Sequence, residues 1–356
     1  MNKRNLFQLM AILMVAVVSI GFVSCGDDDD KNPSGVNQIQ PGEVPSPTIT
    51  DANGNVVQLR SVGGYTFNYD ENGKLASFSG GGETFEIKGN SFTYSYEDDD
   101  DKTVVNVAIN NYGFISAISY MYEEVDRHGE VEKEEGVANF SYNGSKQLTG
   151  FSGNGTWFET DVEDGIQVGS WSGTGSIKTT INWSNGNLIS SNYQSSNYGK
   201  GSYTENGKTY TESESETETG TVTFTYGSER NGALQLPFIV GERVLQMDDF
   251  SIFGVLGLFG VGPVNLPVSY TYNETEVEIE DGEEERHEDH AAYNLKFDMN
   301  SNGTLATEYY QYEGSSYWNT KVSYGYEGTR AVGEQARKLT LSLRKMFHPH
   351  RSHQAK

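Results

Sequence analysis

One recurring phrase constrains the fold of this chain more than any other feature. Each copy has an alternating aromatic segment, a turn rich in Asn, Asp and Gly, and a second segment led by an apolar residue. The copies are FNYDENGKLASFS (67–79), AINNYGFISAIS (108–119), FSYNGSKQLTGFS (140–152), INWSNGNLISS (181–191) and KFDMNSNGTLATEY (296–309). Tight hairpin turns need positive φ angles, which Asn-Gly pairs provide at Asn72-Gly73, Asn143-Gly144, Asn185-Gly186 and Asn302-Gly303. Most copies recur after roughly 30 to 45 residues, which predicts an array of β-hairpins.

The segments beside these turns alternate between apolar and polar residues. Runs such as Tyr65-x-Phe67-x-Tyr69 and Val322-x-Tyr324-x-Tyr326 place apolar side chains on one face. A period of two predicts half-buried antiparallel strands with one face in water and one face covered. The 22 Tyr and 41 Gly residues also favour strands and tight turns over helices. We therefore expect an all-β fold.

The stretch DDFSIFGVLGLFGVGPVNLP (248–267) is the best candidate to cover the apolar face of the sheet. Its uninterrupted apolar part is about a dozen residues long, which is too short to cross a bilayer. It predicts a short apolar helix over Asp249–Phe259, packed on the inner face of the strands. An exposed patch that binds lipid or a partner is the alternative. The predicted fold is an array of antiparallel β-hairpins forming a large twisted or curled sheet around one short apolar helix.

Cys25 is the only cysteine and follows an apolar segment that begins at Leu6. Lys3 and Arg4 precede that segment, which is the layout of a secretory signal peptide. The stretch resembles a bacterial lipoprotein signal, although Phe22 stands where Leu is usual, and the resemblance implies that Cys25 is acylated. Three acyl chains would make a durable membrane tether, because two or more lipid signals are needed for stable anchoring. A single-span anchor is the alternative.

Asp27, Asp28, Asp29 and Asp30 directly follow the predicted lipidation site. This acidic run resembles the signal behind the acylated cysteine of Bacteroidetes lipoproteins, and the resemblance implies display on the outer face of the outer membrane. A lipoprotein facing the periplasm, with a merely solvated charge run, is the alternative.

The chain divides into four segments by composition. Residues 1–24 are the predicted lipoprotein signal peptide, and residues 25–48 hold the acylated cysteine, the acidic run and a Pro-rich flexible spacer. Residues 49–326 form the predicted β-hairpin domain. Residues 327–356 carry seven Lys or Arg against two Glu and read as a basic amphipathic or disordered tail. Docking of the tail on its own domain, contact with an anionic membrane and disorder remain open.

The repeated pattern Y-x-Y-D-x-x-G-x-[LI] resembles the YD-type hairpin repeat. Together with the lipoprotein signal and the late stretch GVLGLFGVGPVNLPVSYTY, it resembles an uncharacterised family of β-rich Bacteroidetes surface lipoproteins, a domain of unknown function. The resemblance spans roughly residues 65–326. It implies an all-β surface lipoprotein and brings no catalytic residues with it.

The formal net charge of −25 excludes nucleic acid as a partner, because affinity for DNA or RNA depends on Lys and Arg contacts. The histidines before the tail are His128, His287 and His290, and no G-x-S-x-G phrase marks a nucleophile. Fifty acidic residues offer many carboxylate pairs of the glycosidase type, yet nothing singles one out. We predict no enzymatic activity and no cofactor.

Two segments match metal-binding patterns in part. Asp298, Asn300, Asn302 and Gly303 match the start of an EF-hand loop, but its twelfth position is Tyr309 and both flanks alternate as strands. A hairpin turn is therefore favoured over calcium. The segment 287–290 (His-Glu-Asp-His) offers zinc ligands, but a solvated hairpin loop within Glu274–Asp289 is favoured, as it is for the acidic loop 97–101.

Three tryptophans are candidates for binding a glycan. Trp157, Trp171 and Trp318 lie among polar, Gly or Ser residues and are candidates for stacking on glycans, with cross-strand packing as the alternative. The sequence therefore predicts a surface-displayed outer-membrane lipoprotein that acts as a non-enzymatic binding or structural module. Its expected partners are the membrane, through the lipid on Cys25, and an extracellular glycan or protein. A glycan-binding accessory protein is the second hypothesis and a hydrolase the third.

Overall fold

The computed structural model describes residues 49–327, apart from 81–82, 89–90, 97–101, 126–127, 164–165, 206, 246–250 and 281. The predicted signal peptide, Cys25, the aspartates 27–30, the spacer, the acidic loop 97–101 and the tail from residue 328 lie outside these residues. Within them the chain is mostly β-strand, which confirms the all-β prediction.

The first nine strands take up the chain to residue 125. Their bounds are β1 Ile49–Thr50, β2 Val56–Val57, β3 Leu59–Val62, β4 Tyr65–Tyr69, β5 Leu75–Gly80, β6 Glu83–Lys88, β7 Ser91–Tyr96, β8 Lys102–Ile109 and β9 Ile115–Val125.

The later elements are longer strands interrupted by two short helices. Their bounds are β10 Val131–Tyr142, β11 Leu148–Glu163, β12 Ile166–Ser184, β13 Asn187–Glu205, β14 Lys208–Arg230, α1 Phe238–Leu245, α2 Ser251–Val255, β15 Asn265–Glu280, β16 Glu283–Met299, β17 Leu305–Tyr312 and β18 Asn319–Tyr326.

Strands β3 to β18 form one closed antiparallel barrel, in which each strand pairs with its neighbours in the sequence. The barrel closes where β18 pairs with β3, with Tyr324 opposite Val62. This arrangement follows from the hairpin repeat, because successive hairpins pair naturally with one another. The predicted curled sheet is therefore confirmed, and its two edges meet.

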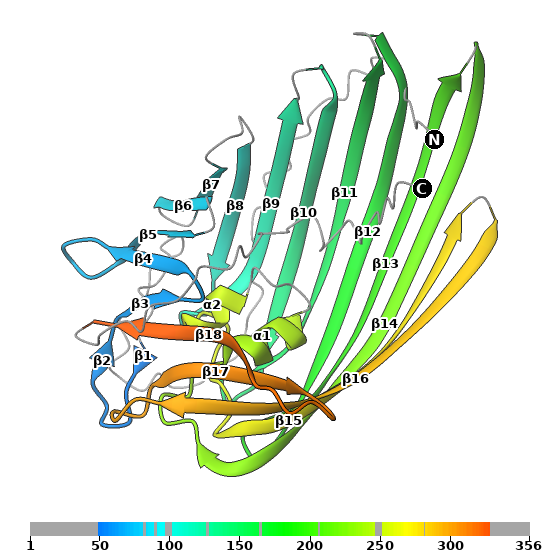
Figure 1. Ribbon diagram of the computed structural model, residues 1–356. Helices are drawn as coiled ribbons and strands as arrows, with labels where there is room; N and C mark the ends of the chain where they lie inside the picture. The colour runs from blue at the N-terminus through cyan, green and yellow to red at the C-terminus, as the bar shows by residue number, and fades with distance from the viewer. Residues whose placement is uncertain are drawn as a thin grey trace, which may run out of the picture.

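The wall of the barrel is uneven in height. Strand β14 has 23 residues and β12 and β13 have 19 each, whereas β3 has 4. At about 3.3 Å per residue, β14 extends ~75 Å. Figure 1 shows the long strands β9 to β16 rising on one side, with α1 and α2 among the strands at their base. A packed base and a tall open wall are thus parts of the same sheet.

The two helices fill the base of the barrel. Phe253 and Leu256, in and just after α2, are 4% and 1% exposed, and the ring of Phe253 packs edge-on against Phe78 of β5. Phe259 packs against Phe140 of β10 with ring centroids 4.8 Å apart. The prediction that the apolar stretch is buried against the aromatic face of the strands is confirmed, although the helix is shorter than Asp249–Phe259.

Helix α1 was not predicted from the sequence, and a buried carboxylate holds its first turn. Glu308 of β17 is fully buried and accepts hydrogen bonds from the backbone N–H of Phe238 (2.8 Å) and Ile239 (3.0 Å). The hydroxyl of Tyr324 also donates to Glu308. Backbone donors at a helix start have no partner within the helix, so the carboxylate satisfies two of them from a distant strand.

A five-residue turn forms at four of the five copies of the recurring phrase, and in the copy 181–191 the two-residue turn Asn185-Gly186 joins the strands. The side chain of the first residue of a five-residue turn accepts backbone N–H bonds, as when Asp70 accepts from Asn72 (2.8 Å) and Lys74 (2.9 Å), except at Asn300, whose side-chain amide donates to the hydroxyl of Thr304 (2.9 Å). The fourth residue has a positive φ, and only Lys146 among these is not glycine. The turns begin at Asp51, Asp70, Asn110, Asn143 and Asn300. Asn143-Gly144 therefore forms the predicted turn, but the positive φ falls two residues after Gly144.

The outward face of the long strands is rich in Ser and Thr. Ser172, Thr174, Ser176 and Lys178 alternate with buried residues along β12, and all four are exposed. The sequence phrase of β14 continues this pattern with Ser and Thr at every second position. Such a face suits contact with water. Within the described part of the chain, neither helix has the length and apolar character needed to cross a bilayer.

Candidate functional site

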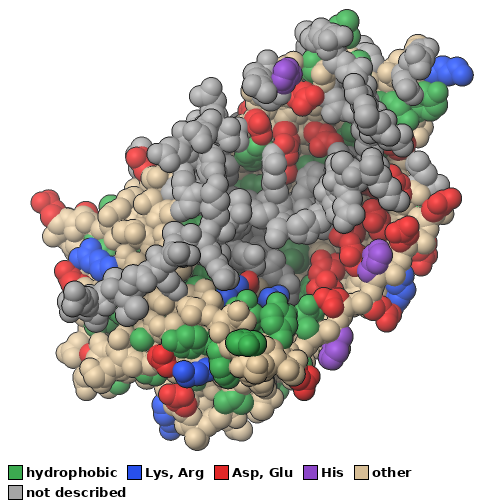
Figure 2. All heavy atoms as spheres, viewed as in Figure 1, with side chains coloured by type: hydrophobic (Ala, Val, Ile, Leu, Met, Phe, Trp, Pro, Cys, Tyr) green, Lys and Arg blue, Asp and Glu red, His purple; other side chains and the backbone are tan. Residues whose placement is uncertain are grey.

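Eight glutamates line the inner face of the tall wall, on β14 and β15. This glutamate wall consists of Glu212, Glu214, Glu216 and Glu218 on β14 with Glu274, Glu276, Glu278 and Glu280 on β15. Alternate residues of a strand share one face, and Val222 and Phe224, which share the face of Glu212 to Glu218 on β14, are buried in the core. The glutamates therefore lie on the inner face of the barrel. Figure 2 shows Asp and Glu side chains gathered over the long-strand side of the molecule.

The register of β14 and β15 brings these carboxylates together in pairs. Glu214 lies opposite Glu280, Glu216 opposite Glu278, and Glu218 opposite Glu276. Like charges at directly opposite positions destabilise a sheet. The positions paired with the wall on β13 and β16 hold no Lys or Arg. The wall is therefore a concentrated negative surface, and among the paired positions only His287, opposite Glu276, holds a basic side chain.

The wall perturbs its own acid groups. Burial, reinforced by the charges of Glu276, Glu218, Glu278 and Glu214, raises the pKa of Glu216 to about 8. Burial also raises the pKa of Glu218, and the Glu274 charge acts in the same direction. Glu216 in the wall therefore retains its proton near neutral pH.

A tyrosine ladder, formed by Tyr270, Tyr272, Tyr293, Tyr310 and Tyr312, lies between the glutamate wall and the packed base. The rings of Tyr270 and Tyr293 stack with centroids 4.7 Å apart, and Tyr293 contacts Tyr312 at 4.8 Å. The guanidinium of Arg243 in α1 lies 5.6 Å and 5.7 Å from the rings of Tyr270 and Tyr272. These are cation–π distances. The ladder ties α1 to the strands that continue into the wall.

The structure buries two of the three tryptophans predicted to stack on glycans. Trp157 and Trp171 are 3% and 4% exposed, and the indole N–H of Trp157 donates to Asn197 (3.1 Å). Their rings lie against glycines: a Cβ at Gly201 would come 2.3 Å from Trp171. The two rings therefore fill space above glycines on the inner face and present no open surface to a sugar, so the stacking prediction is wrong for them.

Trp318 has a different environment. It is 43% exposed in the connection between β17 and β18, beside Tyr317 at 78%, and Tyr312 at the end of β17 is 50% exposed. We call residues 312–318 the aromatic hairpin. The sequence contains a signal for this exposed aromatic turn. In the phrase YEGSSYW three aromatic residues surround turn residues and no aliphatic residue is present.

The candidate metal ligands do not converge. The Asp298–Gly303 segment contains the common five-residue turn, in which the backbone N–H of Asn300 donates to the carbonyl of Thr304 (2.8 Å). His287 and His290 are exposed on strand β16, which forms a hairpin with β15. The segment 274–289 is therefore a solvated hairpin, as predicted, but its arms are paired strands and not a loop. No group of three or more His, Cys, Asp or Glu able to hold a metal occurs among the residues that the structure describes.

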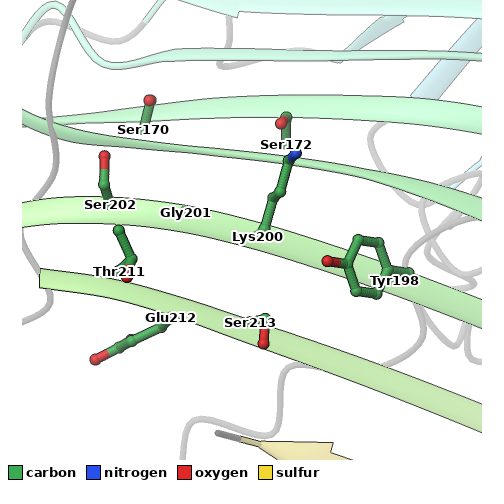
Figure 3. A pocket seen from close by; sticks show the side chains of 9 residues that line it. All are labelled: Ser170, Ser172, Tyr198, Lys200, Gly201, Ser202, Thr211, Glu212 and Ser213. Carbon is green, nitrogen blue, oxygen red and sulfur yellow. The ribbon is translucent and has the colours of Figure 1, made fainter.

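A depression on the outer face of β12, β13 and β14 is lined by hydroxyl and other polar groups. Figure 3 shows Ser170, Ser172, Lys200 and Thr211 among the side chains around it. It is open and lies across a flat sheet face, with no paired acid and base that would support catalysis. We assign no site there.

Comparison with known proteins gives distant structural similarities. No protein-family model matches the chain, and no curated protein matches it. Two crystal structures of porin-like proteins are similar. The one from Bacteroides vulgatus ATCC 8482 has 12% sequence identity and a TM-score of 0.39, and the match covers 74% of this chain and 92% of that one. The one from Bacteroides uniformis ATCC 8492 has 17% identity and a TM-score of 0.36, covering 74% and 88%. Neither similarity assigns a function, and the resemblance to the uncharacterised lipoprotein family stays a prediction.

Proposed function

We propose that this protein is a lipid-anchored, cell-surface binding module without enzymatic activity, and that the glutamate wall is the face that receives a cationic ligand. One observation carries the proposal: glutamates stand in opposed pairs along two long strands, on the side that the sheet curves around. A row of carboxylates repeated along two strands creates a broad negative potential, which attracts cations.

The spacing of the wall suits an extended ligand. Alternate residues of a strand are ~6.8 Å apart and neighbouring strands ~4.8 Å apart, so the wall repeats its charge at short, regular intervals. A Lys- or Arg-rich peptide, or a polyamine, matches such intervals with its own charges. Binding would release the protons that the raised pKa of Glu216 retains near neutral pH.

The test uses octalysine as a cationic probe and the full-length protein. We expect binding that weakens steeply as salt rises from 20 to 300 mM, because screening shortens the reach of the charges. Replacing Glu216, Glu218, Glu276 and Glu278 with Gln should weaken binding at least about tenfold. A matched control removes the same charge from exposed positions elsewhere, at Glu71, Glu86, Glu229 and Glu284. Equal loss in both variants would show that only net charge matters and would overturn the proposed site.

Membrane attachment is proposed through Cys25, with the aspartates 27–30 as the surface address. The Ser- and Thr-rich outer face of β12 and β14 suits water, so the link to the membrane is assigned to the lipid. Cys25→Ala should take up no labelled palmitate. Replacing Asp27 to Asp30 with Ala should keep the lipid but protect the protein from protease added to intact cells. Palmitate on the first variant, or unchanged digestion of the second, would contradict the corresponding claim.

A further inference from the structure

The aromatic hairpin, residues 312–318, presents three aromatic side chains to solvent within seven residues. Tyr317 is 78% exposed, Tyr312 50% and Trp318 43%. Large aromatic side chains that remain this exposed lose the favourable burial that usually holds them in a core. Three of them together at one turn therefore form a patch that needs explanation, whereas single exposed residues do not.

Hydrogen bonds fix the shape of this turn. The side-chain amide of Gln311 donates to the carbonyl of Ser315 (2.7 Å), and the N–H of Ser315 donates to the carbonyl of Tyr312 (3.0 Å). The N–H of Tyr317 donates to the hydroxyl of Ser315 (3.1 Å). Gly314 takes the positive φ of 79° that the bend requires. The turn thus holds its exposed rings in place instead of leaving them on a loose loop.

The ring of Tyr312 is also supported from beneath. It contacts the ring of Tyr293 at 4.8 Å and that of Tyr310 at 5.8 Å, so its orientation is set by the tyrosine ladder while half of it faces solvent. The register of β17 and β18 pairs Tyr310 with Asn319. Tyr312, the last residue of β17, and Tyr317 lie just beyond this pair. Tyr312, held by the tyrosine ladder, and the exposed Tyr317 and Trp318 in the same connection form an aromatic platform.

The surroundings of the platform are polar without being basic. Segment 311–320 reads QYEGSSYWNT and contains no aliphatic side chain. Gln311 also accepts a hydrogen bond from Asn294 of β16 (3.3 Å), which places amide groups beside the rings. A lipid or an apolar protein surface would find no aliphatic area to bury here. An anionic ligand would meet Glu313, which is exposed in the turn.

We infer that the aromatic hairpin is a carbohydrate-binding site, in which the rings of Tyr312, Tyr317 and Trp318 stack on sugar faces. The C–H faces of a sugar ring are apolar and pack on aromatic rings, while its hydroxyls are neutral and exchange hydrogen bonds with amide, hydroxyl and carboxylate groups. Gln311, Glu313 and Ser315 provide these groups at the edge of the platform. The site is distinct from the glutamate wall and does not depend on binding of a cation there.

The test measures binding of four soluble probes, cellohexaose, xylohexaose, mannohexaose and maltohexaose, to the full-length protein by calorimetry. We expect at least one of them to bind. Tyr317→Ala and Trp318→Ala should each weaken that binding about tenfold or more, as loss of an aromatic anchor does in other interfaces, whereas Tyr317→Phe should retain most of it because the ring remains. Both truncations lie at exposed positions, so unfolding should not interfere.

Tyr112→Ala is the matched control, because Tyr112 is 57% exposed in the turn between β8 and β9. It should bind the oligosaccharide as the parent does. The inference is overturned if none of the four probes binds, or if the Tyr112 variant loses as much binding as the Tyr317 variant. Octalysine binding should be the same in all these variants, so failure of the carbohydrate site and failure of the glutamate wall give different results.

Discussion

The junction between Glu308 and helix α1 provides the sharpest test of how the base of the barrel is held. Glu308 is fully buried and accepts two backbone N–H bonds from the first turn of α1 and one from the hydroxyl of Tyr324. Glu308→Ala removes this acceptor from all three donors, although the N–H of Phe238 also donates to the hydroxyl of Tyr324 (3.2 Å). Each buried donor left unsatisfied costs about 1 to 3 kcal/mol.

Because the surroundings relax in part, we expect a total loss of about 3 to 5 kcal/mol, as when one partner of a buried polar pair is removed. This is a large share of a typical stability of about 5 to 15 kcal/mol. The measurement is urea denaturation followed by tyrosine and tryptophan fluorescence. Glu71→Ala, at an exposed turn position, is the control and should change stability by less than about 0.5 kcal/mol.

The protonation of Glu308 adds a pH signature. Burial raises its pKa to about 7, against the opposing effect of the three donors and of Lys321. Because the folded value lies above the ordinary value of 4.5, the unfolded chain loses this proton first as pH rises. The stability contributed by the neutral form is therefore fully present below pH ~4.5 and is lost as pH rises through ~7.

Glu308→Gln separates the two effects, since glutamine keeps one acceptor oxygen and has no proton to lose. It should be less damaging than Glu308→Ala. The stability advantage of the parent over Glu308→Gln should shrink by up to about 3 kcal/mol between pH 4.5 and 7. Two results would refute this reasoning: Glu308→Ala as stable as Glu71→Ala, or a difference between parent and Glu308→Gln that stays constant across this pH range.

Three further predictions concern the core, the glycines and the wall. Leu256→Ala should lower stability by about 2 to 5 kcal/mol, because Leu256 is 1% exposed; an unchanged denaturation midpoint would contradict its place in the core. Gly201→Ala should cost about 1 to 3 kcal/mol and alter the near-UV circular dichroism by displacing Trp171, whereas Gly144→Ala, with nothing within 4 Å, should do neither. Glu216→Gln should reduce the loss of stability that the parent shows as pH rises from ~4.5 through ~8, by about 1 to 3 kcal/mol after allowance for solvent screening; parallel pH profiles of parent and variant would contradict the raised pKa.

The hairpin array and its covered face were predictable because both depend on local chemistry. Turn residues such as Asp70 and Asn300 form the same backbone hydrogen bonds in four of the five copies, and alternation decides which side chains are buried. The buried apolar stretch was predictable for a similar reason, since its run of apolar residues favours burial by itself. Closure of the barrel was not, because it depends on pairing between β3 and β18, which lie at opposite ends of the domain.

Features of the candidate sites that depend on residues far apart in the sequence were likewise not predictable. Helix α1 was missed because its first turn is held by Glu308, some 70 residues away, and not by a local cap. Trp157 and Trp171 looked exposed because glycines and serines surround them in the sequence. In the fold these glycines are what makes room for the rings, as Gly173 and Gly199 do for Trp157. A polar neighbourhood in sequence therefore does not predict exposure when the neighbours are small.

The buried core determines which face of the sheet the wall glutamates occupy. Along β14, Glu alternates with Ser and Thr from 212 to 218, and either set could face outward. A one-residue shift in register would send every glutamate into water, but it would also expose Val222 and Phe224, which are buried at the base of the same strand. The core therefore fixes the register, and the register turns the glutamates inward to face one another. Serine at those positions would fit the same register and avoid the repulsion between opposed carboxylates, so the fold alone does not require the inward charge, and the proposed binding of a cation would offset its cost.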